Sequence, residues 1–558
     1  MKRLFVLFLI AVAVCCKPES EYEWTPPEKS EDGQLELNVP DKDGMTVKGT
    51  VYCGTTPLKD IVVSDGVEVT KTDSEGHYWL PSAKKHGYVF ISVPSGYSAP
   101  ARSNTFPYFW KEVGSKDIDQ ANFKLEKSKI AAGGNFRIIH MTDMHLAHRT
   151  SVGDEKQFSD LFVKDIKEYV STPGVPPLVA VNTGDMSFDL YWNDHQYNLS
   201  SFVNTWKNAK IPLDVYHVPG NHDNDEYATS DFDAEKPFKS IIGPTYYSFN
   251  VGGVHFVMLD NNYYVNNGAG PQIAGDHTIK DMLTDDQHAW IDKDLAMLTD
   301  KNATLVVCMH CPLSIYSSEL KVQASLDDYD RFIAHFTGFS DVHILSGHTH
   351  NSYTLQVNEN VLEHNSGAIC ATWWWTGYNG YPHVCTDGTP GGYAVFDFKN
   401  GKLLNWDYHG ILYDNDKKFR AYDANSVKEW VKSDSFKKLV GSHPDRAADY
   451  DGLPENSVLL NVWGYDDKWT VKATQNGKTI PVTHWYGKDP YHTMCYDIPN
   501  AYYSFPSGCN YHMFYASATD ATSPVEIVVT DRFGNEYKEV VERPREFTDI
   551  FYRKDWKY

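Results

Sequence analysis

The chain has 558 residues, too many for one ordinary domain, and 41% of them are apolar, which is enough for several hydrophobic cores. Its formal net charge of −23 argues against a general nucleic-acid-binding surface, because affinity for a phosphate backbone requires clustered Lys and Arg. We therefore expect about three domains and no nucleic-acid partner.

Residues 1–16 are predicted to be an export signal rather than part of a fold. Lys2 and Arg3 precede an apolar run that is too short to span a bilayer, and Cys15 and Cys16 follow it. This pattern resembles a bacterial lipoprotein signal, in which a Cys is acylated and becomes the new N-terminus. Val14 fits poorly before Cys15, so we expect the lipid on Cys16. The alternative is a plain secretory signal cut nearby.

Residues 17–40 begin with many Glu, Pro and Ser, which predicts a flexible tether that holds the domains off a membrane. The early acidic residues resemble the surface-export signals of Gram-negative lipoproteins. We therefore expect an outer-membrane lipoprotein that faces the periplasm or the cell surface, with a secreted or periplasmic protein as the alternative.

Residues 41–127 predict an N-terminal β-sandwich domain, because short β-branched and aromatic runs alternate with turn residues. The strands are expected at 46–52, 61–63, 67–69 and 88–93. Parts of this stretch resemble the carboxypeptidase regulatory-like, immunoglobulin-type modules of secreted proteins. No group of residues there suggests chemistry, so the expected role is spacing or docking.

Residues 130–412 predict a mixed α/β domain. One helix is expected where apolar residues recur at helical spacing between Phe158 and Val170, and another after the capping box of Thr284 and Gln287. Buried strands are expected at the apolar, β-branched runs 136–141, 178–182, 213–218, 304–309 and 342–346.

Residues of the kinds that bind metal ions follow each of these five runs. They stand in Thr142-Asp143-Met144-His145, Gly184-Asp185, Gly220-Asn221-His222-Asp223, His310 and Gly347-His348-Thr349-His350. Ligands of open α/β sheets collect beyond the carboxyl ends of strands, so these fragments are expected to meet in one crevice. Their donors suit Mn, Fe or Zn, and two such ions can hold both the attacking and the leaving oxygen of a displacement at phosphorus. The alternative is that the residues form only turns and caps.

The residues beside Asn221 have a different expected role. His222 carries an imidazole that a neighbouring carboxylate, Asp223, could orient, and such an imidazole can protonate a leaving alkoxide. His222 is therefore the candidate general acid, with Asp223 as its expected partner.

The fragments resemble the five signature blocks of the calcineurin-like metallophosphoesterases, over roughly residues 135–410. The resemblance implies a four-layer-type α/β core, in which helices flank a β-sandwich. Under it, a hydroxide that bridges two metals attacks phosphorus and His222 assists departure of the leaving group. It also implies two ligand sets, namely Asp143, His145, Asp185 and His350 for one metal and Asp185, Asn221, His310 and His348 for the other.

Departures from subfamily patterns narrow the expectation. Purple acid phosphatases place a Tyr where this chain has Phe188, and protein Ser/Thr phosphatases place a Glu where it has Asp223, so both subfamilies are disfavoured. The blocks are closer to those of cyclic-nucleotide and glycerol phosphodiesterases, which favours a phosphodiester over a phosphomonoester without deciding between them. Two other classes stay open: a non-catalytic surface binding protein, and a metal-dependent nuclease, for which no basic groove is evident.

Aromatic and amide residues near the blocks are candidates for substrate binding. Asn261 follows an expected strand at 255–260, and Trp373, Trp374, Trp375 and Tyr378 follow the last block. Three consecutive Trp cannot all be buried on one face of a strand, so at least one is expected to face the cleft. Its indole could stack on a base, a sugar or a choline-like head group. The alternative is that these residues pack the seam between domains.

Residues 413–450 predict a polar linker with a helix, and residues 451–550 predict a C-terminal β-sandwich domain, because strand-like alternation returns there. This domain could cover the mouth of the site with Tyr502 and Tyr503, or it could form a dimer. The sequence leaves the oligomeric state open.

An exported protein permits disulfides. Cys370 with Cys385, or Cys495 with Cys509, could each close a loop, although sequence alone cannot assign the pairing. Buried structural cysteines, rather than metal ligands, are expected on either side of His310, at Cys308 and Cys311.

Overall fold

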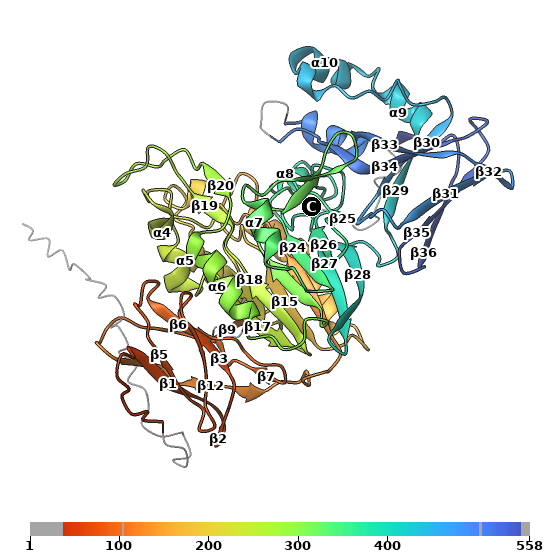
Figure 1. Ribbon diagram of the computed structural model, residues 1–558. Helices are drawn as coiled ribbons and strands as arrows, with labels where there is room; N and C mark the ends of the chain where they lie inside the picture. Colours follow the sequence, from red (N-terminus) through yellow and green to blue (C-terminus); the bar gives the residue numbers. More distant parts are fainter. Residues whose placement is uncertain (1–36, 103–104, 501–504, 548–558) are drawn as a thin grey trace, which may run out of the picture.

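The computed structural model describes residues 37–102, 105–500 and 505–547. The expected export signal, the expected lipid site at Cys16 and both Tyr502 and Tyr503 lie outside the described residues. In the described ranges, no helix combines the length and the apolar character needed to cross a bilayer. The chain forms three regions in a row: an N-terminal region at one end, an α/β region in the middle and a C-terminal region at the other end (Figure 1).

The N-terminal region is a β-sandwich of two sheets, as the sequence predicts. Its strands are β1 (Val47–Cys53), β2 (Thr56–Pro57), β3 (Val62–Ser64), β4 (Val69–Lys71), β5 (His77–Leu80), β6 (Tyr88–Ile91), β10 (Trp110–Glu112), β11 (Asp119–Gln120) and β12 (Phe123–Lys124). In one sheet β2, β5, β11 and β12 pair with β1, and the other sheet has the order β10-β6-β3-β4. Two small ribbons are made by β7 (Tyr97–Ser98) with β13 (Glu126–Lys127) and by β8 (Ala101–Arg102) with β9 (Phe106–Pro107).

The N-terminal sandwich is fixed to the α/β region by packing and by hydrogen bonds. Buried apolar side chains of the two regions belong to one continuous hydrophobic cluster. The hydroxyl of Tyr246 donates to the carbonyl oxygen of Gly66 at 2.8 Å, and the indole nitrogen of Trp290 donates to Ser64 Oγ at 3.1 Å. These bonds satisfy polar groups that burial would otherwise leave unpaired, so the sandwich is part of the scaffold.

The α/β region contains two sheets whose facing side chains share one core. The first has the order β16-β15-β14-β27-β28, with strands β14 (Phe136–Met141), β15 (Leu178–Asn182), β16 (Val215–His217), β27 (Gly392–Lys399) and β28 (Lys402–Gly410). The second has the order β17-β18-β21-β24-β26-β25, with strands β17 (Tyr247–Val251), β18 (Val254–Met258), β21 (Leu305–Cys308), β24 (Val342–Ser346), β25 (Tyr353–Gln356) and β26 (Val361–Asn365). All five strands expected before the polar fragments are present, two of them slightly shorter than expected.

Helices accompany the sheets, and α5, α6 and α7 lie on the near side of them in Figure 1. Their bounds are α1 (Asp154–Gln157), the π-helix η1 (Phe158–Val163), α2 (Lys164–Ser171), the 3-10 helix η2 (Asp189–Tyr191), α3 (Leu199–Ala209), α4 (Asp231–Ala234), α5 (Lys236–Ile241), α6 (Asp285–Leu295), α7 (Tyr329–Ala334) and α8 (Trp375–Tyr378). The apolar stripe from Phe158 onward is helical as predicted. Ribbons formed by β19 (Asn262–Tyr264) with β20 (Ile279–Asp281) and by β22 (Ser314–Tyr316) with β23 (Val322–Ala324) complete the region.

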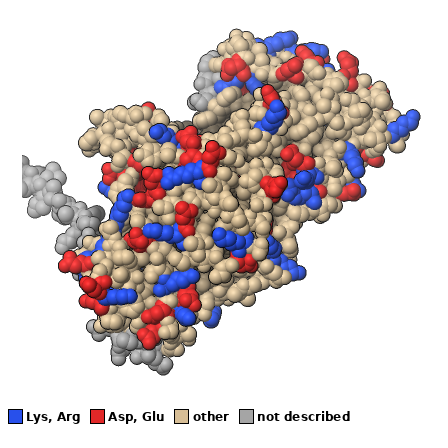
Figure 2. Space-filling view, in the orientation of Figure 1, with Lys and Arg blue, Asp and Glu red and all other residues tan. Residues whose placement is uncertain are grey.

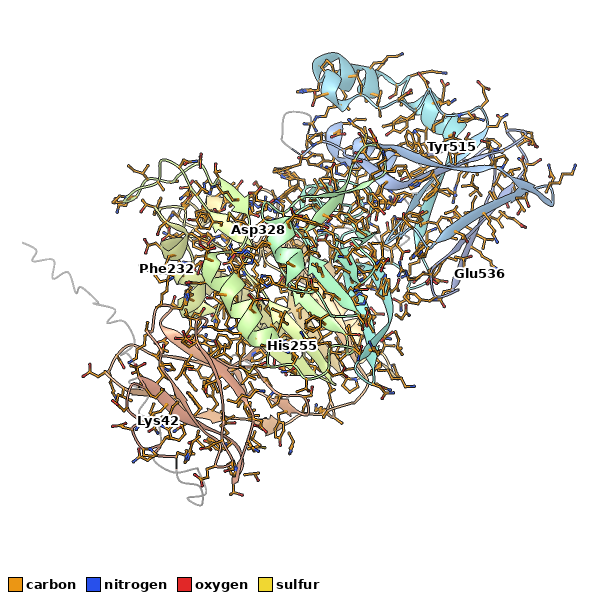
Figure 3. The ribbon with its side chains drawn as sticks, viewed as in Figure 1. Lys42, Phe232, His255, Asp328, Tyr515 and Glu536 are labelled. Atoms are coloured by element: carbon orange, nitrogen blue, oxygen red, sulfur yellow. The ribbon has the colours of Figure 1, made fainter. Side chains whose placement is uncertain are left out.

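Helix α6 shows how local signals fix this scaffold. The Thr284 side chain accepts a hydrogen bond from the Gln287 backbone N–H at 3.3 Å, which is the predicted N-cap. From β18, the His255 side chain reaches α6 and bonds to Asp294 at 2.8 Å (Figure 3).

Acidic and basic side chains are interspersed over the face shown in Figure 2, so the net negative charge is not gathered in one patch there.

The C-terminal region has two further sheets. Their orders are β29-β30-β34-β33 and β32-β31-β35-β36, with strands β29 (Phe419–Asp423), β30 (Ser457–Val462), β31 (Thr470–Gln475), β32 (Lys478–Ile480), β33 (Val482–Lys488), β34 (Cys509–Ser517), β35 (Val525–Thr530) and β36 (Glu536–Val541). Its helices are α9 (Ala424–Trp430), α10 (Asp434–Ser442), η3 (Pro444–Arg446), α11 (Pro490–His492) and the π-helix η4 (Thr493–Asp497).

The segment expected as a linker, 413–450, differs from the expectation at its start. Strand β29 pairs with β30 and so belongs to the C-terminal sheet. The sequence does not predict this strand because it carries the charged Arg420. The Arg420 side chain is buried, and its guanidinium donates to the Gly388 carbonyl oxygen at 2.9 Å. A partnered charge can be buried in a strand.

Candidate metal centre

The candidate ligands sit on the turns that follow the parallel strands β14, β15, β16, β21 and β24, at the carboxyl ends of both sets of strands. Most of them have a left-handed backbone, with φ of 54° at Asp143, 43° at His145, 52° at Asp185, 67° at His348 and 54° at His350. This conformation is uncommon for residues other than glycine and costs on the order of 1–3 kcal/mol each. It persists where the surrounding structure enforces it, and such strain gathers at functional sites.

One group of ligand atoms converges around His145. Its Nε2 atom lies 3.0 Å from His350 Nε2 and 3.3 Å from Asp185 Oδ2, and His350 Nε2 lies 3.3 Å from Asp143 Oδ1. All four residues are buried. Two imidazole nitrogens that face each other at this distance, with two carboxylate oxygens beside them, form the donor set of a divalent cation.

A second group converges around Asn221. Its Oδ1 atom lies 3.0 Å from His310 Nε2 and 2.9 Å from His348 Nδ1, and His310 Nε2 lies 3.2 Å from Asp185 Oδ2. The same Asp185 oxygen therefore faces His145 on one side and His310 on the other. The structure brings together all seven residues that the sequence proposed as ligands, with Asp185 between the two groups.

The remaining atoms of these residues are arranged to leave the metal-facing atoms free. His310 Nδ1 donates to the Thr183 carbonyl oxygen and His350 Nδ1 donates to the Ala371 carbonyl oxygen, both at 2.7 Å, so each Nε2 keeps its lone pair. Asp143 Oδ2 accepts from the Thr142 hydroxyl and the His348 N–H, whereas its Oδ1 is buried without a hydrogen-bond partner. An orphaned carboxylate oxygen of this kind fits a cation ligand.

The carboxylates are held in the ionised form that a cation requires. Burial alone raises the pKa of Asp185, but the neighbouring His310, His222 and His145 outweigh it and hold the pKa below its usual range. A carboxylate that stays ionised in a buried position binds a divalent ion without first losing a proton.

His222 is oriented by a different carboxylate from the one expected. Its Nδ1 bonds to Asp189 Oδ1 at 2.7 Å. Burial lowers the pKa of His222, but Asp189 and Asp185 raise it by more, and the pKa of Asp189 falls to about 2. The other Asp189 oxygen bonds to His277 Nδ1 at 2.7 Å and accepts from the Tyr264 hydroxyl at 3.2 Å. The sequence analysis did not identify Asp189, His277 and Tyr264, because their spacing along the chain does not indicate a site.

Asp223, the partner expected for His222, has a structural position instead. Its carboxylate accepts hydrogen bonds from the backbone N–H groups of Met186, Ser187 and Gly220. Adjacent side chains on a tight turn point in different directions, and this one ties the Asp185 turn to the Asn221 turn. Burial and the nearby Asp185 raise the pKa of Asp223 to about 6.

The three tryptophans have three different environments. Trp373 is half-buried, and its ring stacks on that of the ligand His350 at 4.0 Å. Trp374 is fully buried, and its indole nitrogen donates to the Met144 carbonyl oxygen at 2.9 Å, so it is a core residue. Trp375 is half-buried at the start of α8 and packs edge-on against Tyr378, which is 56% exposed.

Asn261 does not face a substrate cleft. It is fully buried, and its amide nitrogen donates to the Cys311 carbonyl oxygen at 2.7 Å. Its Oδ1 accepts from the backbone N–H groups of His310 and Cys311 at 3.2 and 3.0 Å. Both ends of the side chain are used within the protein, so Asn261 positions the turn that carries His310.

Phe188 occupies the place where purple acid phosphatases carry a tyrosine. Its ring centroid lies 4.9 Å from that of His145 and 4.5 Å from that of His222. A phenyl ring has no oxygen to give a metal, so this chain lacks the tyrosinate ligand at that position.

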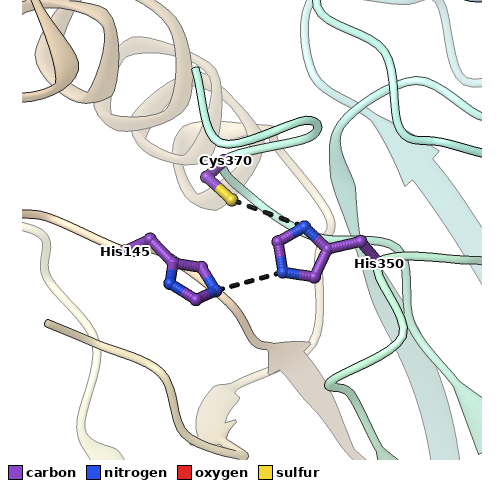
Figure 4. A group of neighbouring side chains, drawn as sticks. All are labelled: His145, His350 and Cys370. Carbon is purple, nitrogen blue, oxygen red and sulfur yellow. Dashed lines mark hydrogen bonds between the residues drawn. The ribbon is translucent and has the colours of Figure 1, made fainter. Parts of the chain in front are cut away.

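The cysteines are free thiols in all of the described residues, 53, 308, 311, 370, 385, 495 and 509, so neither suggested disulfide forms. Cys308 and Cys311 are buried, as expected. Figure 4 shows Cys370 beside His350, with the sulfur 3.7 Å from Nδ1, while His145 faces the opposite nitrogen of the same ring. The thiol thus lies behind a ligand that the sequence did not connect with it.

Gly347 leaves no room for a side chain. A Cβ atom there would lie 2.0 Å from Thr142 Oγ1 and 2.7 Å from Asp143 Oδ2, so one of these must move. We expect Gly347→Ala to weaken metal binding by about 10- to 100-fold, as changes behind metal ligands do. Titration with Mn or Zn measures the affinity. Gly441→Ala is the matched control because nothing lies within 4 Å of its added Cβ, and equal affinity of both variants would contradict the expectation.

Family models match most of the chain. The calcineurin-like phosphoesterase model matches residues 136–352, the model for the N terminal of calcineurin-like phosphoesterase matches residues 45–128, and the model for the C terminal matches residues 363–537. Among curated proteins, purple acid phosphatase 15 from Arabidopsis thaliana is 30% identical over 171 residues, which is 29% of this chain and 27% of that protein. The chain thus spans about a quarter of that relative.

Two solved structures match part of the chain at low sequence identity. A dimetal phosphatase from Danio rerio is 13% identical with a TM-score of 0.32, covering 48% of this chain and 98% of that one. PhoD is 12% identical with a TM-score of 0.34, covering 64% of this chain and 80% of that one.

Proposed function

The chain belongs to the calcineurin-like phosphoesterase family, and we propose that it hydrolyses a small phosphodiester or phosphomonoester with two divalent metal ions. One observation carries the proposal. Asp185 Oδ2 lies 3.3 Å from His145 Nε2 and 3.2 Å from His310 Nε2, so one carboxylate oxygen is shared by two ligand groups. An oxygen in this position could serve as a ligand in both groups if two ions were bound.

The donor set suits Mn, Fe or Zn. When bound, such ions supply positive charge at the phosphoryl oxygens and lower the pKa of water. The two groups that would hold them are Asp143, His145, Asp185 and His350, and Asp185, Asn221, His310 and His348.

Other groups of the chain position the ligand imidazoles and donate the proton. The carbonyl oxygens of Thr183 and Ala371 fix the imidazoles of His310 and His350. His222 is held through Nδ1 by Asp189, so its Nε2 is the nitrogen left to give a proton to the leaving oxygen. Trp373, beside His350, is the substrate-facing member of the three tryptophans under this proposal.

A small substrate is favoured over nucleic acid. Basic side chains are mixed with acidic ones on the face seen in Figure 2, and a net charge of −23 opposes a polyanion. We further propose, from the sequence of residues 1–16, that a lipid on Cys16 attaches the exported protein to a membrane. Both points are independent of the chemistry at the metal centre.

The proposal is tested with protein that lacks residues 1–16 and is loaded with Mn or Zn. We expect hydrolysis of p-nitrophenyl phosphate or bis-p-nitrophenyl phosphate, lost in His348→Ala and kept in His148→Ala, whose side chain is 58% exposed. Preference for the diester would make the protein a phosphodiesterase, and preference for the monoester would make it a phosphatase. Cleavage of DNA in place of both would favour a nuclease, and metal-loaded protein inactive on all three would favour a binding protein.

A further inference from the structure

Three aromatic rings form a stack that leads away from the metal centre. The rings of His350 and Trp373 stack at 4.0 Å with an interplanar angle of 22°, and those of Trp373 and Phe505 stack at 3.5 Å, also at 22°. Two rings at such distances cannot share one face of an indole, so Trp373 is enclosed between them. Phe505 is the outermost ring, and it comes from the C-terminal region, just before β34.

Two features of this stack are unexplained by folding alone. The Trp373 indole nitrogen is buried without a hydrogen-bond partner, although buried indole N–H groups usually find one. Phe505 is 40% exposed and has a φ of 70°, a left-handed backbone that is rare for a bulky side chain. The unpaired N–H of Trp373 and the exposed ring of Phe505 thus both lie close to the candidate ligand His350.

Hydrogen bonds connect the C-terminal region to the segment of the α/β region that carries Trp373. The Thr372 hydroxyl lies 2.8 Å from His492 Nε2, and His492 Nδ1 lies 2.7 Å from the Ser507 hydroxyl. Thr372 adjoins Trp373, and Ser507 stands two residues after Phe505. The backbone N–H of Gly508 also donates to the Thr386 carbonyl oxygen at 3.2 Å. The buried Thr372–His492 and His492–Ser507 bonds thus link the chain segment of Trp373 to that of Phe505.

We propose that Phe505 and Trp373 form the subsite for the leaving group, and that the natural substrate carries a planar aromatic group there. The proposal rests on the phosphoesterase function proposed above. The outer face of Phe505 stacks on the aromatic group, and Trp373 supports the inner face of Phe505. A single exposed face suits a flat ring, whereas a quaternary ammonium group is recognised by a cage of several rings.

The C-terminal region therefore determines specificity. Stacking on an aromatic side chain is favourable for any flat ring, and neither face of Trp373 is free to provide it. Phe505 is the residue at this stack that can, and it is separated by more than a hundred residues of chain from the last metal ligand, His350. A chain without the C-terminal region would keep all seven ligands and lose this contact.

The test compares 2-naphthyl and trifluoroethyl esters of the class that the wild-type enzyme hydrolyses. In Phe505→Ala we expect the ratio of kcat/KM for the naphthyl ester to that for the trifluoroethyl ester to fall about fivefold, mainly through KM. Phe505→Tyr keeps a ring and should keep the ratio. The intrinsic reactivity of the two esters cancels when ratios of two variants are compared.

Phe232→Ala is the matched control. Phe232 is also 40% exposed, but it lies on α4, on the side of the α/β region away from the C-terminal region (Figure 3). Its removal should leave the ratio unchanged. An unchanged ratio in folded, metal-loaded Phe505→Ala would overturn the proposal, as would an equal loss for both esters.

A binding measurement separates this inference from the proposed function. Titration with 2-naphthylphosphonate, followed by calorimetry, should show that the metal-loaded wild type binds this compound and that binding is about fivefold weaker in Phe505→Ala. Such binding without turnover of any ester would remove the enzyme function and keep the aromatic subsite. Turnover with no difference in phosphonate binding would keep the function and remove the subsite.

Discussion

Asp185→Asn is expected to abolish turnover and to lower the occupancy of both metal positions. The backbone N–H of His222 donates to Asp185 Oδ1 at 2.8 Å, so an asparagine would keep its carbonyl oxygen on that side. Its amide nitrogen would then replace Oδ2, the atom that faces both His145 and His310. An N–H group has no lone pair for a cation, and two ions lose a ligand at once. We expect kcat/KM to fall by about 10³-fold or more, because bound ions supply several kcal/mol of charge stabilisation.

The metal content of the dialysed protein, measured by elemental analysis, distinguishes a ligand of both metal positions from a ligand of one position. Asp143→Asn is the matched comparison, since Asp143 Oδ1 lies near His145 and His350, and the only bond of the carboxylate to the other group is from the backbone N–H of His348 to Oδ2. It should lower the content by one ion per chain, whereas Asp185→Asn should lower it by two. Unchanged metal content in Asp185→Asn would mean that the bridge is misassigned, even if activity were lost.

Strand ends are the part of this site that sequence could predict. Asp143, Asp185, His310 and His348 each follow an apolar run, and the runs are the parallel strands β14, β15, β21 and β24. Parallel strands leave one edge with all their carboxyl ends together, so residue type plus strand position was sufficient to assemble ligands from over two hundred residues of chain. The strand pattern likewise predicted a mixed α/β domain, whereas the four-layer arrangement was implied by the family resemblance.

Side-chain direction on turns is the part that sequence could not predict. His222 and Asp223 are adjacent, and adjacency suggested a pair, yet the His222 ring meets Asp189 while Asp223 binds three backbone N–H groups. Asp189 lies on η2, four residues beyond Asp185. Contacts of this kind depend on how two turns pack, and neither turn alone carries the information.

The aromatic segment shows the same limit across regions. Trp373 and Trp374 both have left-handed backbones, so the segment is a tight turn and not a strand, and the two rings leave it in different directions. Trp374 enters the core while Trp373 reaches His350 and Phe505. The sequence predicts that one tryptophan faces the site, but it does not identify Phe505 as the partner of Trp373, because that contact depends on how the two regions pack.

His222→Ala is expected to keep both metals and to slow turnover in proportion to how poor the leaving group is. With Nδ1 held by Asp189 at 2.7 Å, Nε2 is the free nitrogen of the ring, and a proton from it matters most when the departing oxygen is a strong base. We expect a loss of about 10²–10⁴-fold for an alkyl ester and a much smaller loss for a p-nitrophenyl ester, whose leaving group needs no proton. Asp189→Asn should show the same pattern in weaker form, because the ring keeps a hydrogen bond and loses a charge. Equal slowing of both esters would remove the general-acid role. Loss of a metal ion would instead make His222 a ligand, since a nitrogen of its ring lies within 4.8 Å of the ligand atoms of His145 and Asp185.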